Sequence, residues 1–275
     1  DHDGLEQEAA PGDLPGREAV SSGVPALDRL TGGGLELGTS CLVAGTSGAG
    51  KSTIASLYAG SIASRGGRAA VYCFDEGRET FLRRAAGLGL ALPEHVAEGR
   101  VELRDMAVGE VAAGEFVHDV RTAVRERQVQ VVIIDSITGY LHAMSGAQEV
   151  ILQLHELVSY LASAGVLTLM IVTEHGMLSD RSEIDASYLA DSVLVLRHFE
   201  AHGAMHRCIA MLKRRDGPHE RTIRQLRTGP EGVDVGPPLR DFRGVFTGAP
   251  VYHGEKENVM DSEGPGAAKG TVRDA

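Results

Sequence analysis

A glycine-rich segment at residues 45–53 constrains the fold of this chain more than any other feature. It reads Gly-Thr-Ser-Gly-Ala-Gly-Lys-Ser-Thr and fits the pattern G-x-x-x-x-G-K-[ST]. An apolar run at residues 40–44 precedes it, and residues 53–64 have helical periodicity. A strand, a glycine-rich turn and a helix in this order present backbone N–H groups to an anion, so we expect a phosphate-binding loop. An ordinary glycine-rich turn is the simpler alternative, but such a turn would not require a lysine and a hydroxyl residue directly after its last glycine.

The side chains of this loop suit the phosphates of ATP and a magnesium ion. Lys51 supplies a mobile positive charge for the β- and γ-phosphates. The Ser52 hydroxyl is a hard oxygen ligand of the kind that Mg²⁺ prefers. We therefore predict ATP and Mg²⁺ as cofactors. The other residues expected to contact the nucleotide are Thr46, Ser47, Gly48, Ala49, Gly50 and Thr53.

A second apolar run, at residues 131–134, ends in Asp135. A strand that ends in an acidic residue places its carboxylate at the carboxyl edge of the sheet, beside the phosphate loop. Asp135 would then hold the magnesium ion through water. Many strands end in Asp because this residue favours turns and helix caps, so the prediction depends on the upstream loop.

Two further carboxylates, Asp75 and Glu76, follow the predicted strand at residues 68–74. Transfer of a phosphoryl group to water needs a group that orients the attacking water. Glu76 is the first candidate for this base and Asp75 is the second. The alternative is a pair of acidic residues that stabilise the N-terminus of the helix predicted at residues 78–88. Sequence spacing alone does not distinguish between the catalytic and the helix-stabilising interpretation of this pair.

The rest of the chain predicts an α/β fold with a mainly parallel, twisted sheet flanked by helices, because predicted strands and helices alternate. The additional strands are expected at residues 101–104 and 166–172, and the additional helices at residues 115–127 and 149–163. From residue 192 onward, strand-like runs linked by short turns predict a C-terminal antiparallel β extension. These runs are residues 193–197, 207–212 and 222–227.

Composition sets the domain organisation and excludes some partners. Residues 1–18 are expected to be a flexible leader or linker, residues 19–252 the folded domain, and residues 253–275 a flexible tail. The net charge of −11 disfavours nucleic acid as a partner. The apolar runs are too short for a membrane span, and the three dispersed cysteines suggest reduced thiols in a cytoplasmic protein.

Taken together, these motifs resemble the RecA superfamily of P-loop NTPases and, within it, the KaiC-like ATPases. The similarity extends over residues 19–252 and is greatest to the second domain of two-domain KaiC-like proteins, so we expect one half of such a protein or a single-domain relative. Besides the loop and the Asp75–Glu76 pair, the similar segments are residues 22–28, 32–35, 213–219, 222–224 and 248–250.

The resemblance implies self-association into a hexameric ring with ATP between neighbouring subunits. Lys213, Arg215 and His219 would then reach the γ-phosphate bound by the adjacent subunit, with Arg215 as an arginine finger. A planar guanidinium suits the charge that spreads over the transferring phosphoryl group. Judged by spacing alone, a basic hairpin exposed to solvent would be the simpler interpretation.

The resemblance also implies serine/threonine autokinase activity, with one departure from the family pattern. The family's clock protein phosphorylates an adjacent Ser-Thr pair, and the corresponding residues here are Ser187 and Tyr188. Ser187 keeps a hydroxyl that could accept phosphate, whereas Tyr188 replaces the threonine. The alternative is a turn before a strand with Tyr188 packed. Another predicted strand ends in Thr173, Glu174 and His175. These residues are either a polar sensor of the phosphate or an ordinary strand end whose polar groups are hydrogen-bonded locally.

Three functions remain as hypotheses. The first is a KaiC-like ring ATPase in signalling or circadian-type regulation, with a signalling protein as its partner. The second is a RecA/RadA-type DNA-binding recombinase, which would need basic loops. The candidate loops, residues 137–148 and 176–185, contain only one Arg and no Lys, which disfavours this function. The third is a nucleotide-gated assembly module with little turnover.

Overall fold

The computed structural model describes residues 17–106, 113–143, 147–174, 186–201, 203–215, 217–246 and 250–252. Across these residues, nine strands form one sheet in the order β11-β10-β9-β8-β3-β7-β6-β4-β5. Neighbours from β8 to β5 pair in parallel, whereas β9, β10 and β11 pair antiparallel. The strands are β3 (Ser40–Thr46), β4 (Ala69–Cys73), β5 (Val101–Asp105), β6 (Val131–Asp135), β7 (Leu167–Glu174), β8 (Ser192–Ala201), β9 (Ala204–Arg214), β10 (Arg224–Gly229) and β11 (Gly232–Pro238).

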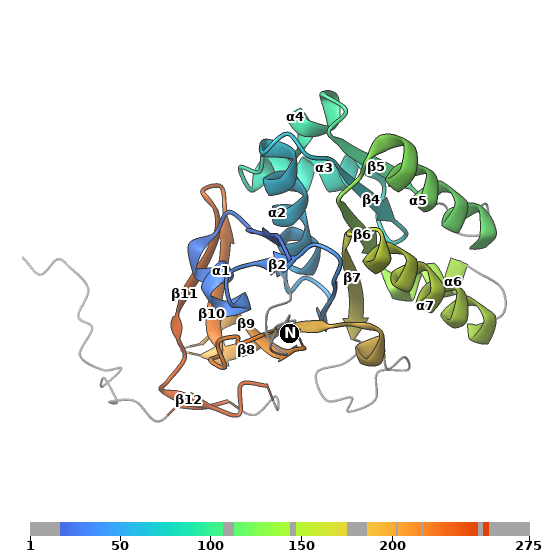
Figure 1. Ribbon diagram of the computed structural model, residues 1–275. Helices are drawn as coiled ribbons and strands as arrows, with labels where there is room; N and C mark the ends of the chain where they lie inside the picture. The colour runs from blue at the N-terminus through green and yellow to red at the C-terminus, as the bar shows by residue number, and fades with distance from the viewer. Residues whose placement is uncertain are drawn as a thin grey trace, which may run out of the picture.

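Helices cover both faces of this sheet (Figure 1). One layer contains α1 (Pro25–Thr31), α2 (Lys51–Ser64), α3 (Arg78–Gly87) and α4 (Leu92–Ala97), and the other contains α5 (Ala113–Arg127), α6 (Ile137–Ala143) and α7 (Ala147–Ser163). Short paired strands lie outside the main sheet: β1 (Ala19–Val20) with β2 (Leu35–Glu36), and β12 (Phe242–Arg243) with β13 (Val251–Tyr252). A 3₁₀ helix, η1 (Ala186–Leu189), precedes β8.

The two layers follow from the alternation of side chains along buried strands. In β6, Val131 and Ile133 pack in the cluster that includes α1 to α4, whereas Val132 and Ile134 pack in the cluster that includes α5 to α7. The buried aromatic ring of Phe116 anchors α5 in the second cluster. The sheet is therefore apolar on both faces along its parallel half, which confirms the predicted α/β fold.

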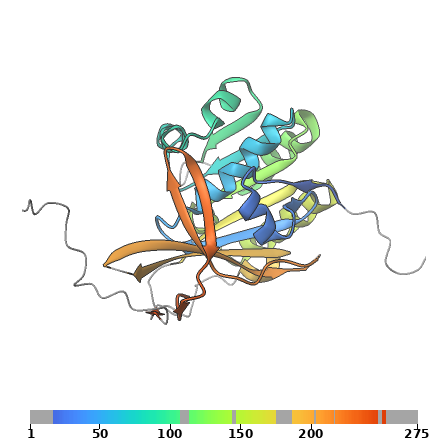
Figure 2. The ribbon, with the colours of Figure 1, turned by 90° about the vertical axis from the view of Figure 1, so that its left-hand side faces the viewer.

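The C-terminal strands change the direction of the sheet (Figure 2). The hairpin of β10 and β11 rises toward α3, and its turn reaches the connection between α3 and α4. There, a Cβ atom at Gly89 would lie 2.6 Å from the Pro230 carbonyl oxygen, so the two backbones are in close contact. The predicted antiparallel extension is confirmed, although its first strand, β8, pairs in parallel with β3.

One sequence-based expectation about local structure was wrong. We expected a loop at residues 137–148, but α6 occupies residues 137–143 and α7 begins at Ala147. Ser136 Oγ accepts a hydrogen bond from the Gly139 N–H, and Ile137, Tyr140 and Leu141 are buried. The spacing of these apolar residues is helical, but the segment is too short to give a clear periodic signal. The second expected loop, residues 176–185, lies outside the described residues.

Candidate active site

The loop between β3 and α2 has the backbone geometry that its glycines permit. Gly50 has φ 103° and immediately precedes Lys51, the first residue of α2. Gly45 has φ 153°, and a Cβ atom there would overlap with the Leu196 carbonyl of β8. Glycine therefore allows the loop both to turn sharply and to approach the neighbouring strand closely.

Two polar contacts fix the shape of this loop. Lys51 Nζ donates a hydrogen bond to the Thr46 carbonyl at 2.9 Å, so the ammonium group lies over the loop's own backbone. Thr46 Oγ1 lies 3.0 Å from Nδ1 of His198 on β8. Burial, together with the nearby charges of Arg207 and Lys51, lowers the pKa of His198. The contact between Thr46 and His198 therefore ties the loop to β8.

A cavity of about 380 Å³ opens beside the loop and lies within the usual size range of ligand pockets. It is bounded by the phosphate loop, the carboxyl ends of β4, β6 and β7, helix α3, and the strands β9 and β10. The lining residues are Ser47, Gly48, Gly50, Lys51, Ser52, Thr53, Asp75, Glu76, Arg84, Leu88, Asp135, Thr173, Arg207 and Thr228. Residues expected at the site from three separate segments of the sequence thus lie around one space.

Two of the loop residues that were expected to contact the nucleotide are not part of the lining. Ala49 is buried, and Thr46 instead makes the contacts with Lys51 and His198. These two residues therefore shape the loop rather than face the cavity.

Asp135 ends β6, lines this cavity and is only 5% exposed. Burial raises its pKa to about 6, a hydrogen bond with Ser52 lowers it, and the charge of Glu76 raises it. One carboxylate oxygen, Oδ2, is buried without a hydrogen-bond partner among the described residues. A buried, unsatisfied carboxylate beside a hydroxyl fits a small divalent cation that prefers oxygen ligands, as Mg²⁺ does.

Asp75 and Glu76 follow β4 and line the same cavity. Glu76 Oε1 lies 2.5 Å from a guanidinium nitrogen of Arg84 on α3. The N–H group of Arg78, the first residue of α3, donates a hydrogen bond to Asp105 Oδ2 at 3.0 Å. The N-cap residue of α3 is Gly77, and the interpretation in which Asp75 and Glu76 stabilise this helix N-terminus through the helix dipole stays an alternative.

A close contact holds Asp75 in place. A Cβ atom added at Gly139 of α6 would overlap with Asp75 Oδ1 and would lie 2.8 Å from Phe74 Cβ. The loop after β4 therefore packs directly on the backbone of α6. Only a glycine at this position of α6 leaves room for that packing.

Sequence reasoning missed Arg84, Leu88, Arg207 and Thr228 as cavity residues. They lie on or directly after α3 and on β9 and β10, elements that are far apart in the sequence but line one cavity. A motif with fixed spacing gives no signal for such residues. Thr173 at the end of β7, a candidate sensor, does line the cavity. Nothing is described for the Glu174 side chain or for His175.

The basic residues predicted to act on a neighbouring subunit do not line this cavity. Lys213 Nζ donates to the Ala190 carbonyl at 2.7 Å, and Arg215 is 53% exposed with its guanidinium 3.6 Å from Asp191 Oδ1. His219 is half-buried. All three therefore lie outside the cavity of their own chain, as a role on the adjacent subunit requires.

Arg214, between Lys213 and Arg215, fastens this segment to the body of the protein. Its guanidinium donates to Glu36 Oε1 at 2.8 Å and to the carbonyls of Thr31 and Gly34. The side chain is only 8% exposed. The strand end that bears the basic residues is therefore held firmly while Arg215 remains accessible.

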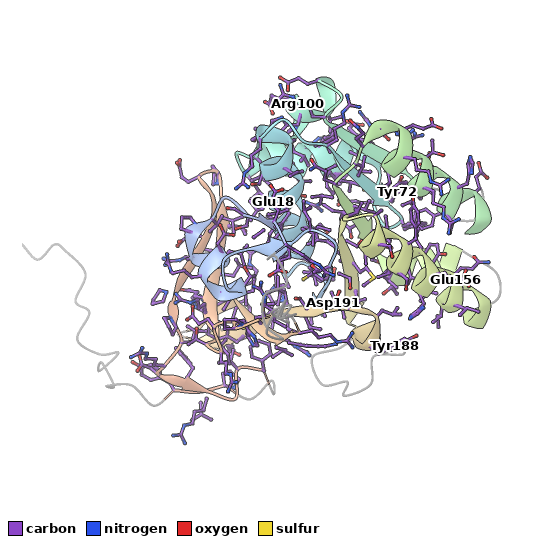
Figure 3. The ribbon with its side chains drawn as sticks, viewed as in Figure 1. Glu18, Tyr72, Arg100, Glu156, Tyr188 and Asp191 are labelled. Atoms are coloured by element: carbon purple, nitrogen blue, oxygen red, sulfur yellow. The ribbon has the colours of Figure 1, made fainter. Side chains whose placement is uncertain are left out.

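Ser187 lies in η1, and its side chain is outside the described part of the chain. Tyr188 is 53% exposed and lies at the periphery of the molecule, whereas Asp191 lies nearer the middle (Figure 3). The alternative in which Tyr188 packs against the strand was therefore wrong. A phosphosite at Ser187 stays a prediction.

The fold is that of a RecA-like ATPase. It combines a mostly parallel sheet covered by helices on both faces, a glycine-rich turn between β3 and α2, and antiparallel strands at the end of the sheet. The family model described as "ATPase: KaiC" matches residues 20–240. The chain therefore belongs to the KaiC ATPase family.

Similar curated proteins carry clock names. The chain is 27% identical over 242 residues to the circadian clock protein KaiC3 of Synechocystis sp., covering 86% of this chain and 47% of that protein. It is 25% identical to the circadian clock oscillator protein KaiC of Prochlorococcus marinus (84% and 46% covered) and 26% identical to that of Thermostichus vulcanus (84% and 45%). The chain thus spans about half the length of these relatives.

In the parts of the chain that the structure describes, no helix combines the length and the apolar character needed to cross a membrane.

Proposed function

We propose that this chain binds ATP with magnesium in the cavity beside the β3–α2 loop and hydrolyses the ATP. The observation that carries the proposal is the convergence of Lys51, Ser52, Glu76 and Asp135 on that one cavity. Phosphoryl transfer to water requires a cation that binds the phosphates, oxygen ligands that hold a metal ion and a carboxylate that orients the water. These four residues provide all three.

Each residue has a specific role in this proposal. The N–H groups of the loop and the ammonium of Lys51 bind and orient the β- and γ-phosphates. Ser52 and Asp135 hold the magnesium ion, which neutralises the charge on those phosphates when it is bound.

In the chemical step, the oxygen of a water molecule bonds to the γ-phosphorus while the bond to the β,γ-bridging oxygen breaks. Glu76 accepts the proton of the water, and ADP leaves with the electron pair of the broken bond. Asp75 takes the same role if its carboxylate lies nearer the water. Hydrolysis yields ADP and inorganic phosphate.

The proposal includes self-association into a hexameric ring. Lys213, Arg215 and His219 lie outside their own cavity but on a strand end that Arg214 anchors, so they are available to a neighbouring subunit. In the ring, Arg215 stabilises the charge on the γ-phosphate of the adjacent subunit's ATP.

A regulatory role, in signalling or a circadian-type process with a protein partner in the cytoplasm, extends this proposal. It is supported by relatives that are named circadian clock proteins. Autokinase activity at Ser187 is part of the same extension, because this serine corresponds to the first residue of the Ser-Thr pair that the family's clock protein phosphorylates.

Two alternatives have less support. A recombinase would need a basic loop after Asp135, but the segment that follows it forms the packed helix α6, which has no Lys or Arg. An assembly module with little turnover would not need a candidate base at the cavity, whereas Glu76 lines it.

Incubation of the purified protein with magnesium and γ-labelled ATP tests the proposal. We expect free labelled phosphate, and label retained on the protein at Ser187 would support the autokinase. Tight binding of ATP without release of phosphate would instead favour the assembly module. Size measurement with and without ATP would test the ring.

A further inference from the structure

Arg84 is a cationic residue of the cavity that the motifs do not predict. It lies on α3 and lines the cavity together with Glu76 and Asp135. Its guanidinium nitrogen Nη1 is 2.5 Å from Glu76 Oε1, and the two side chains are 34% and 20% exposed. The pair is therefore partly shielded from solvent and forms part of the cavity wall.

A second contact holds the guanidinium of Arg84 in one orientation. The central carbon of this group lies 5.0 Å from the centre of the Phe81 ring, one helical turn earlier on α3. Phe81 is 1% exposed, so the ring is a fixed platform. A guanidinium that stacks on an aromatic ring and binds a carboxylate at its edge has little freedom to rotate.

The neighbouring Arg83 shows what an ordinary surface pair on the same helix looks like. Arg83 also bonds a glutamate, Glu79, but their side chains are 76% and 85% exposed. Such an exposed pair contributes little to stability and positions nothing. The difference between the two arginines lies in the platform of Phe81 and in the location of Glu76 on the cavity wall.

We propose that Arg84 is a positioning residue that aims the Glu76 carboxylate at the water that attacks ATP. This inference rests on the proposed function. The guanidinium engages Oε1 and fixes the plane of the carboxylate, which leaves Oε2 to accept the hydrogen bond and then the proton of the water. Without Arg84 the carboxylate rotates freely, and only a fraction of bound ATP meets a correctly placed base.

The first test compares steady-state phosphate release by wild type, Arg84→Ala, Arg84→Lys and the control Arg83→Ala. For Arg84→Ala we expect kcat to fall about tenfold or more while KM and the dissociation constant for ATP change less than about twofold. Lysine keeps the charge but not the planar fork, so Arg84→Lys should recover part of the loss. Arg83→Ala should behave as wild type.

A double mutant separates positioning of Glu76 from a general effect on the structure. If Arg84 acts through this carboxylate, Arg84→Ala should not lower kcat further in a Glu76→Gln background. An equal loss in both backgrounds would overturn the inference, because Arg84 would then act independently of Glu76. A large rise in the dissociation constant for ATP would also overturn it, since Arg84 would then bind the nucleotide directly.

The outcome for wild type separates this inference from the proposed function. Wild-type protein that binds ATP without hydrolysing it would overturn both. Active wild type together with fully active Arg84→Ala would overturn only the role of Arg84.

Discussion

Lys51, the first residue of α2, and Asp135, the last residue of β6, line the same cavity at the carboxyl edge of the sheet. The strand β7 lies between β3, which leads into the loop before Lys51, and β6, so the two residues follow strands that are not neighbours. An ammonium and a carboxylate that line one cavity can together hold a triphosphate and its magnesium ion. The predictions that follow depend on this relationship.

Substitution Lys51→Ala should abolish binding of ATP. Lys51 is the cation that the loop itself carries, and its ammonium already lies over the loop at 2.9 Å from the Thr46 carbonyl. Without it, the loop offers only its N–H groups to the phosphates, next to the carboxylates of Asp75, Glu76 and Asp135. Titration with ATP by calorimetry measures the effect, and Arg65→Ala, an exposed cation at the far end of α2, is the control. Unchanged affinity in Lys51→Ala would place the phosphates elsewhere.

Removal of magnesium by a chelator should stop hydrolysis, and Ser52→Ala should raise the magnesium concentration needed for half-maximal rate. Ser52 provides one of the two oxygen ligands proposed for the ion, so its loss weakens the metal site without removing it. The matched control is Ser61→Ala, further along the same helix. A magnesium dependence identical to that of wild type would exclude Ser52 as a ligand.

Substitution Glu76→Gln should leave ATP binding intact and slow hydrolysis by at least about a hundredfold, the usual contribution of a general base. Glutamine keeps the shape of the side chain but cannot accept the proton of the water. Single-turnover phosphate release measures the chemical step. The exposed Glu79→Gln provides the control, and Asp75→Asn shows whether the neighbouring carboxylate takes the role instead.

Substitution Arg215→Ala should leave ATP binding intact, because the guanidinium lies outside the cavity of its own chain. It should remove turnover, because the proposed arginine finger no longer stabilises the charge on the γ-phosphate of the adjacent subunit's ATP. In a ring, a mixture of Arg215→Ala and Lys51→Ala subunits should regain part of the activity. The Arg215→Ala subunit supplies an intact ATP site, and the neighbouring Lys51→Ala subunit supplies an intact arginine finger. If Arg215→Ala alone is inactive and the mixture is inactive too, Arg215 does not act on the ATP of a neighbouring subunit. Arg243→Ala, exposed on β12, is the control.

The sequence was sufficient to predict the parallel core and the segments that meet at the candidate site. Buried strands that alternate with helices imply a parallel sheet, and the carboxyl ends of parallel strands meet at one edge. Residues at three such ends, in the loop after β3 and at Asp75 and Asp135, could therefore be placed together without a structure. Their spacing in the sequence carries no information about this proximity, but the topology does.

The rest of the site could not be predicted, because it depends on how separate elements pack. Arg84 on α3 and Arg207 on β9 line the same cavity although they are far apart in the sequence. Helix α6 was missed because its apolar residues span barely two turns. Side chains that are brought together by such packing leave no fixed spacing in the sequence.

Substitution Phe116→Ala should destabilise the fold by about 3–5 kcal/mol, the usual cost of removing a large buried aromatic side chain. The Phe116 ring is fully buried, with its centre 5.2 Å from that of Tyr72, 5.5 Å from that of Phe74 and 5.1 Å from that of Tyr140. Phe74 directly precedes the carboxylates of the site, so the cavity left by the substitution also loosens their support. Denaturant unfolding measures the loss, and Val117→Ala, at a half-buried position of the same helix, should cost clearly less. Equal losses would show that the aromatic cluster carries no special share of the stability. Because ATP binds only the folded protein, saturating ATP should recover part of the loss in both variants.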